Sequence, residues 1–116
     1  MKFVIDRSRW KNAKHGLGTT LLLNSQGYMC CLGQVSKQLG ASDEQIEGCM
    51  GPAGVVGRYG IKDILAPLIG SNYELSGRAM CINDNTTIDD VQRESELISL
   101  FATYGHELSF EDSFND

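Results

Sequence analysis

The stretch between residues 89 and 110 constrains the fold most, because a helical pattern is followed directly by a strand pattern. Apolar side chains at helical spacing define one face of residues 89–104: Val91, Leu97, Ile98, Phe101 and Ala102. Gly105 is a natural stop for that helix. Residues 106–110 then alternate polar and apolar side chains, with Leu108 and Phe110 predicted to point inward. A chain that carries both periodicities is expected to be α+β.

Two short helices are predicted nearer the start of the chain. Leu32, Val35 and Leu39 follow helical spacing, and Gly40 suits the end of that helix. Residues 42–45 read Ser-Asp-Glu-Gln, the pattern of a capping box, which predicts a second helix ending near Gly48. Residues 61–69 are a further helical candidate, although the proline at position 67 favours an early stop.

Strands are predicted at residues 2–6, 19–23 and 78–82, in addition to residues 106–110. Residues 24–27 form a turn, after which residues 28–31 either return as a hairpin arm or lead into a helix. Residues 51–60 contain four glycines and a proline, and they predict a loop. The expected architecture is a small antiparallel sheet with three to four short helices packed on it.

The length of 116 residues fits a single domain, and the acidic residues 111–116 are expected to form a frayed tail. No apolar run approaches the roughly 18–20 residues that a membrane span requires. The opening apolar stretch is also shorter than the roughly 7–15 residues of a secretory signal. The chain is therefore expected to be cytoplasmic.

Charge is distributed unevenly along the chain. Residues 1–80 carry nine basic and six acidic side chains, a net +3, whereas residues 81–116 carry one basic and nine acidic side chains, a net −8; together they give the net −5. The favoured interpretation is that the two ends lie side by side and neutralise each other. The alternative is that one end faces a charged partner.

The four cysteines are expected to be reduced thiols, and adjacent Cys30 and Cys31 suit a hydrophobic core. Cys31 at a helix start, with His15 or His106 as a base, is the one arrangement that suggests a nucleophile. The cysteine spacings do not match a zinc module, and the Asn-Asp-Asn run around Asp84 does not match a calcium loop. We therefore expect no metal, no cofactor and no catalytic residue.

Residues 7–11 combine basic side chains with an aromatic ring, a composition that can contact nucleic acid. The sequence pI near 4.9 argues against that use, and the tryptophan is better explained as a core anchor. For contact with a partner, we select the basic start, one turn acid and the acidic start of the last helix: Arg7, Arg9, Trp10, Asp84, Asp89, Asp90 and Glu94.

One motif resembles a known group of proteins. The run Gly27-Tyr28-Met29-Cys30-Cys31-Leu32-Gly33 resembles a pattern in small proteins encoded by bacteriophages and prophages. Their layout is similar over most of the chain, with an opening Ile-Asp strand, a nearby tryptophan, an Ile-Asn-Asp run at 82–84 and a glutamate-rich helix that ends in a phenylalanine. The resemblance implies a phage accessory protein, a class that often acts by binding a host protein, including defence systems such as CRISPR effectors.

These observations favour a protein-binding module over an enzyme. The hypothesis is a compact domain that binds and inhibits a host factor, as a monomer or as a homodimer. One alternative is a small-ligand binder or enzyme with a cleft containing Cys31, Asp84 or His106. A second alternative is nucleic-acid contact through the basic start.

Overall fold

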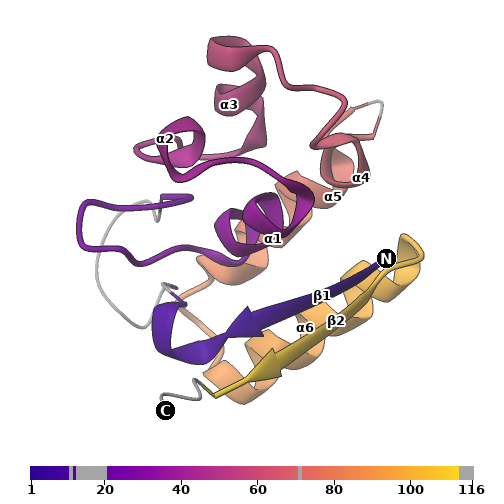
Figure 1. The fold of residues 1–116 in the computed structure, drawn as a ribbon. Coiled ribbons are helices and arrows are strands. Elements are labelled where there is room, and N and C mark those ends of the chain that lie inside the picture. The colour runs from indigo at the N-terminus through magenta and orange to yellow at the C-terminus, as the bar shows by residue number, and fades with distance from the viewer. Residues whose placement is uncertain (11, 13–20, 71, 113–116) are drawn as a thin grey trace.

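The computed structural model describes residues 1–10, 12, 21–70 and 72–112. Among these residues, the two strands are the first and last elements and the helices lie between them in the chain (Figure 1). In chain order they are β1 (Lys2–Asp6), the 3-10 helix η1 (Arg7–Arg9), α1 (Cys31–Leu39), α2 (Asp43–Ile46), α3 (Pro52–Tyr59), α4 (Ala66–Ile69), α5 (Glu74–Asn83), α6 (Asp90–Thr103) and β2 (Glu107–Glu111). The α+β class is therefore as expected. The described residues contain six α-helices rather than three or four.

The sheet consists of β1 and β2, which pair in parallel with Lys2 beside Glu107 and Asp6 beside Glu111. The prediction of an antiparallel sheet is wrong. Parallel neighbours need a long crossover, and here the crossover is nearly the whole chain between the first and last elements. Figure 1 shows the two strands side by side with α6 behind them. Phe3 on β1 meets Phe101 of α6 edge-on, with 6.2 Å between ring centroids.

The side of β1 away from β2 is closed by two glutamine side chains from α1. The Gln38 amide accepts from Val4 N–H at 2.9 Å and donates to Val4 C=O at 2.7 Å. The Gln34 amide does the same with the backbone of Asp6, at 2.8 and 3.0 Å. Each amide thus copies the bonding of a neighbouring strand. These side chains take the place of the additional strand that the sequence predicted.

The other predicted strands are not formed in the described residues. Leu23 makes a single bridge to Glu47, and Met29 makes a single bridge to Trp10. Residues 78–82 are helical, because Leu75 and Ala79 place a buried stripe along α5. Positions 13–20, including the first part of the predicted strand 19–23, lie outside the described residues, as do Lys11 and His15.

The local signals around α1 and α2 are confirmed. The turn after Leu23 has Gly27 at φ +89°, and α1 ends at Gly40 in the left-handed conformation. Ser42 and Gln45 form both hydrogen bonds of the capping box at the start of α2.

Residues 51–60 contain the helix α3 (Pro52–Tyr59), so the predicted loop is wrong. Pro52 occupies the first turn, where its missing N–H costs nothing, and Gly60 ends the helix at φ +68°. Between them Val55 is fully buried. Apolar burial outweighs the low helix propensity of the internal glycines.

The last helix is correctly located, but part of its predicted buried face is wrong. Leu97 and Phe101 are buried, whereas Val91 is 80% exposed and Ile98 is 40% exposed. Ala102 is exposed as well. The reason is that Arg93 is 2% exposed and occupies the same inward stripe as Leu97 and Phe101, which turns the other apolar side chains toward solvent.

Candidate functional site

The sequence singled out thiols and charged residues, and the structure places most of them in internal contacts. Cys30 and Cys31 are buried, and loss of hydration raises the pKa of Cys30 to about 11 and that of Cys31 well above its ordinary value. Both are therefore protonated at neutral pH, which suits core packing rather than nucleophilic attack.

The basic start and the acidic end lie side by side, as the favoured interpretation of the charge pattern expected. The Arg7 guanidinium makes a two-point contact with the Glu94 carboxylate, with both N–O distances at 2.8 Å. It also reaches Asp112 at 3.4 Å, and Lys2 pairs with Glu107 at 3.7 Å. The hydrogen bond to Glu94 raises the pKa of Arg7. Arg7 and Glu94, both predicted to contact a partner, thus bind each other.

Trp10 is a core residue, only 3% exposed, so its ring is withdrawn from the surface. It packs on Phe110 with 4.7 Å between ring centroids, and its indole N–H donates to Asn83 Oδ1 at 2.7 Å. This is the anchor role that the sequence favoured. Arg9 remains exposed and donates to the carbonyl of Gly27 at 3.3 Å.

The three predicted contact aspartates all have structural bonds. Asp84 accepts from the Asn83 side-chain amide at 3.0 Å. Asp89 caps α6 by accepting from Gln92 N–H at 2.9 Å. Asp90 accepts from the Arg93 guanidinium at 3.2 Å. Each of these carboxylates therefore has an internal structural role, in a helix cap or in a bond to a neighbouring side chain.

Asn83 and Arg93 form a buried polar network that no sequence pattern predicted, in which the Arg93 guanidinium donates to Asn83 C=O at 3.4 Å. Asn83 Oδ1 accepts from both the Trp10 indole and the Cys31 backbone N–H, at 2.7 and 3.2 Å. It therefore joins the start of α1 to the end of α5. The high burial of this network makes it part of the scaffold rather than a binding surface.

A cleft of about 490 Å³ lies between α3 and α5, and it is larger than the hollow around α4 described below. Its lining is mostly apolar or glycine: Gly48, Cys49, Met50, Gly51, Pro52, Ala53, Gly54, Arg58, Tyr73, Ser76, Gly77 and Met80. A volume of this size is typical of sites for small molecules or for one or two side chains of a partner.

Two methionines give the cleft adaptable walls. Met50 is 57% exposed. Met80 extends from α5 so far toward the start of α3 that a Cβ added to Gly51 would lie 3.0 Å from its sulfur. Flexible thioether side chains suit apolar surfaces that adjust to an occupant.

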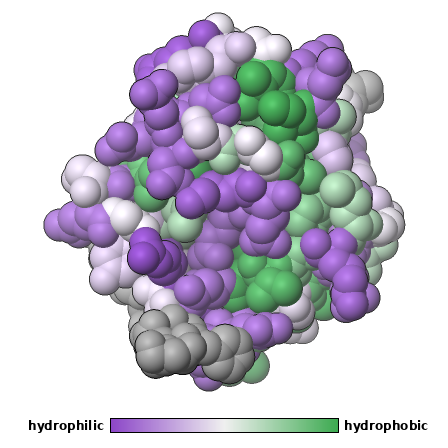
Figure 2. Space-filling view, viewed as in Figure 1, coloured by the Kyte–Doolittle hydropathy of each residue, from purple (hydrophilic) through white to green (hydrophobic). Residues whose placement is uncertain are grey.

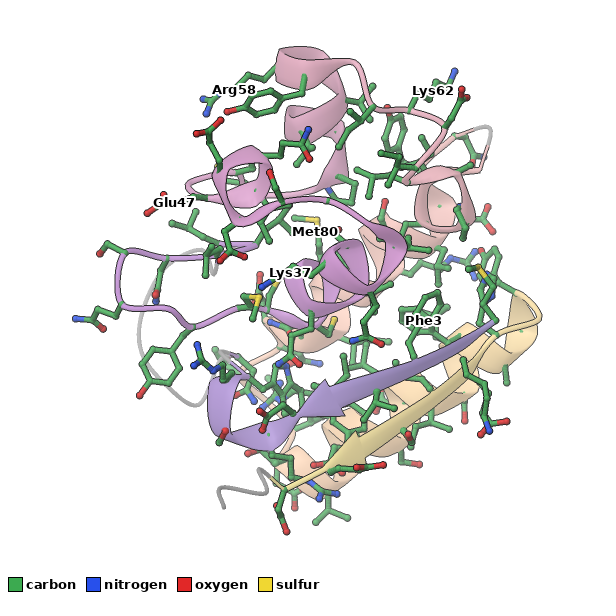
Figure 3. The ribbon with its side chains drawn as sticks, in the orientation of Figure 1. Phe3, Lys37, Glu47, Arg58, Lys62 and Met80 are labelled. Carbon is green, nitrogen blue, oxygen red and sulfur yellow. The ribbon has the colours of Figure 1, made fainter. Side chains whose placement is uncertain are left out.

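Arg58 supplies the cation of the cleft. Figure 3 shows it on α3 at the outside of the molecule, whereas Met80 comes from α5. No ion pair joins Arg58 to any carboxylate among the described residues. A ligand or partner with a carboxylate beside an apolar group could therefore pair the carboxylate with Arg58 and place the apolar group in the cleft.

The backbone at the cleft is held in an uncommon conformation. Tyr73 precedes α5 with φ +59°, the one non-glycine residue with positive φ among those described. Its carbonyl accepts from the Ser76 hydroxyl at 3.2 Å. Left-handed backbone at a bulky residue is costly and is often found at binding sites.

A second, smaller hollow of about 320 Å³ lies around α4 and the start of α5. There the Tyr104 hydroxyl donates to the Glu74 carboxylate, and this bond raises the pKa of Tyr104. Glu74 also pairs with Arg78 at 3.8 Å. These polar groups are already matched with each other, which makes this hollow the weaker candidate.

Within the described parts of the chain, no group of three or more histidine, cysteine, aspartate or glutamate side chains is arranged to hold a metal ion. The described helices are also too short or too polar to cross a bilayer. No protein-family model, curated protein or solved structure matches the chain.

Proposed function

We propose that this protein is a protein-binding module whose α3–α5 cleft receives an apolar side chain flanked by a carboxylate on the partner. The observation that carries the proposal is the cleft itself, an apolar hollow with two methionines in its wall and Arg58 at its margin. An apolar anchor seated in a pocket is the usual centre of a protein interface. Arg58 supplies the charge complementarity that selects an acidic neighbour.

The biological setting of the proposal comes from the resemblance of residues 27–33 to phage and prophage proteins. In that setting the partner is a host protein, and binding inhibits or redirects it. A host defence system such as CRISPR is one target of this kind.

The test is a pull-down from bacterial lysate with two matched pairs of variants, performed at low and moderate salt with nuclease present. Gly77→Trp fills the cleft from α5, and its new Cβ meets no atom within 4 Å. Gly57→Trp is the control, because its Cβ is equally free but Gly57 does not line the cleft. Arg58→Glu reverses the charge at the cleft, and Lys62→Glu makes the same change outside it.

A stoichiometric partner that is retained by the two controls and lost by Gly77→Trp and Arg58→Glu supports the proposal. Equal retention by all four variants contradicts it. Loss of the captured protein on nuclease treatment would instead indicate nucleic-acid contact.

A small ligand is the second candidate, favoured by the cleft volume, which lies within the range of roughly 300–1,000 Å³ found for such sites. Its expected chemistry is the same, an apolar body with an anionic group for Arg58. Native mass spectrometry distinguishes the two, since a bound metabolite adds a defined small mass that Gly77→Trp abolishes.

A further inference from the structure

The solvent side of α6 carries a continuous uncharged surface. Four exposed residues lie within about 60° of one another around the helix, at about 100° per residue. We call these four residues the α6 face: Val91, Ser95, Ile98 and Ala102. Val91 and Ile98 are 80% and 40% exposed, although both are large apolar side chains. Positions 92, 99 and 103, which border the α6 face on one side, are exposed and uncharged as well.

The charged side chains of α6 are bound elsewhere in the molecule. The helix contains four of them: Asp90, Arg93, Glu94 and Glu96. Asp90 and Arg93 bind each other, and Glu94 binds Arg7. Glu96 accepts from a side-chain amide one turn earlier in the helix, at 2.8 Å. The α6 face is therefore neutral on a chain whose net charge is −5.

The position of α6 in the fold leaves this face accessible. The helix forms an outer layer behind β1 and β2 in the view of Figure 1. The side of the molecule turned toward the viewer is different, because in Figure 2 hydrophilic side chains cover much of it and border its hydrophobic areas. Among the described residues, Val91 is the most exposed large apolar side chain. Apolar side chains along one helix face suit burial against another element.

The α6 face is complementary to itself. The helix spans residues 90–103, so its midpoint lies between residues 96 and 97. Val91 and Ala102 are equally distant from this midpoint, and so are Ser95 and Ile98. If two copies of the helix lie antiparallel about it, Val91 of one copy meets Ala102 of the other, and Ile98 meets Ser95. Each large side chain then faces a small one, which lets the two helices pack closely.

We propose that two copies of this chain bind each other through the α6 face, with the two helices antiparallel. The residues of the face are spaced four, three and four apart, which is the spacing of a helix–helix seam. A two-fold axis through the helix midpoint repeats every contact on both sides of the interface. The antiparallel arrangement also brings the positive end of each helix dipole beside the negative end of the other.

Charge favours a second copy of this chain over a charged partner. A strongly basic or acidic partner meets no opposite charge on the α6 face, because none of its four residues is ionisable. Two copies with a net charge of −5 each repel one another over most orientations. Pairing through the α6 face brings no charged side chain of one face against the other.

The length of the helix limits the strength of the dimer. α6 has 14 residues and is therefore about 21 Å long, at 1.5 Å per residue. One pair of helices of this length buries less than a standard stable interface. The dimer is expected to be weak and to form as the protein concentration rises from about 10 µM to about 1 mM.

Sedimentation equilibrium over this concentration range tests the proposal. The mass is expected to rise from 12.7 kDa toward twice that value. Ile98→Lys is expected to raise the dissociation constant at least about tenfold, because it places a charge inside the interface. Ile64→Lys is the matched control, since it makes the same change outside α6 at an isoleucine of similar exposure, 37% against 40%. It is expected to leave the dissociation constant unchanged.

Salt separates this interface from association through charges. Added salt is expected to strengthen the dimer, because it screens the repulsion between two acidic chains while the interface has no charge of its own to lose. An interface that relied on opposite charges would weaken under the same conditions.

A pair of charge designs tests the orientation of the helices. Val91→Lys and Ala102→Glu are each expected to weaken the dimer at least about tenfold. Combined in one chain, they are expected to restore it to within about threefold, because each introduced lysine faces an introduced glutamate of the other copy. The control combination, Val91→Lys with Ala102→Lys, is expected to remain weak. In a parallel pair, the first combination would instead place like charges together.

The cleft proposal is tested separately, because no residue of α6 lines the α3–α5 cleft. Ile98→Lys is therefore expected to leave capture of a cleft partner unchanged.

Four results would overturn the proposed dimer. The first is a mass that stays at 12.7 kDa up to about 1 mM protein. The second is equal dimerisation by Ile98→Lys and Ile64→Lys. The third is a combined Val91→Lys and Ala102→Glu chain that associates no better than either single variant. The fourth is a lysate protein that a monomeric wild-type chain captures and Ile98→Lys loses, which would assign the α6 face to a different partner.

Discussion

Replacing Arg93 by methionine tests whether its buried guanidinium holds the turn between α5 and α6. Arg93 is 2% exposed and donates to the carbonyls of Ile82, Asn83, Asn85 and Ile88, at 2.6–3.4 Å. Its fifth acceptor is the Asp90 carboxylate at 3.2 Å. Methionine keeps the length and apolar volume of the side chain but removes every donor.

The expected loss of unfolding free energy is about 3–5 kcal/mol, the usual cost of breaking a buried charged interaction by removing one partner. The four carbonyls left without this donor would each cost about 1–3 kcal/mol if fully buried. Three of these bonds are only partly buried, so water relieves part of that sum. Against a total stability of about 5–15 kcal/mol, the variant is expected to be near its folding limit.

The assay is urea unfolding followed by the fluorescence of Trp10, the one tryptophan of the chain. Its indole is bonded to Asn83, whose carbonyl is one of the Arg93 acceptors, so the probe reports on the affected region. With a slope of about 1.5 kcal/mol/M, a loss of about 3 kcal/mol lowers the midpoint by about 2 M. Arg93→Lys, with fewer donors and no fork, is expected to lose an intermediate amount.

Arg78→Met is the matched control, because its side chain is 62% exposed and its pair with Glu74 spans 3.8 Å. An exposed pair of this kind contributes about 0–1 kcal/mol. If Arg93→Met costs no more than Arg78→Met, the inferred role of the guanidinium is wrong.

Three further predictions concern thiols and glycines. Burial raises the pKa of Cys30 to about 11 in the folded state, whereas the unfolded thiol loses its proton above about pH 8.5, so the free energy of unfolding should fall from that pH toward pH 11. Urea midpoints at pH 8 and pH 10.5 measure this fall, which should be smaller in Cys30→Ala. Iodoacetamide should alkylate exposed Cys81 first and buried Cys31 only on unfolding, and mass spectrometry showing equal rates would contradict the placement of these thiols. A Cβ at Gly33 would lie 1.8 Å from the carbonyl oxygen of Leu22, so Gly33→Ala should lower the free energy of unfolding by about 3 kcal/mol or more in thermal unfolding. Gly77→Ala has open space around the new Cβ and should raise the free energy of unfolding by about 0.5–1 kcal/mol.

The elements that were correctly predicted are those stabilised by neighbouring residues. The capping box of Ser42 and Gln45 forms within four residues, and Gly40 and Gly105 adopt the positive φ that ends a helix. These are local conformational preferences, so they are visible in any short window of the sequence.

The error at residues 51–60 shows the limit of composition as a guide. The glycines predicted a loop, but Pro52 and Gly60 mark the two ends of α3, and the burial of Val55 offsets the cost of the glycines between them. The order of proline at the start and glycine at the end was the sequence signal that could have identified this helix.

The candidate cleft could not be predicted from the sequence, because its lining comes from three separate segments. Met50, Arg58 and Met80 line the same cleft only because the folded chain places α3 near α5. Nothing in their spacing along the chain distinguishes them from ordinary apolar and charged residues. Similarly, the acids and bases chosen as partner contacts had suitable chemistry, but several of them pair with each other once the two ends meet.

Local sequence was sufficient for the α+β class, the position of α6 and the strand that follows it. Tertiary structure decided the parallel pairing of the strands, the outward rotation of Val91 and the closure of one sheet edge by Gln34 and Gln38. The physical reason is the range of the interactions. Caps and periodicity act within a few residues, whereas strand pairing and the burial of Arg93 depend on groups brought together by the folded chain.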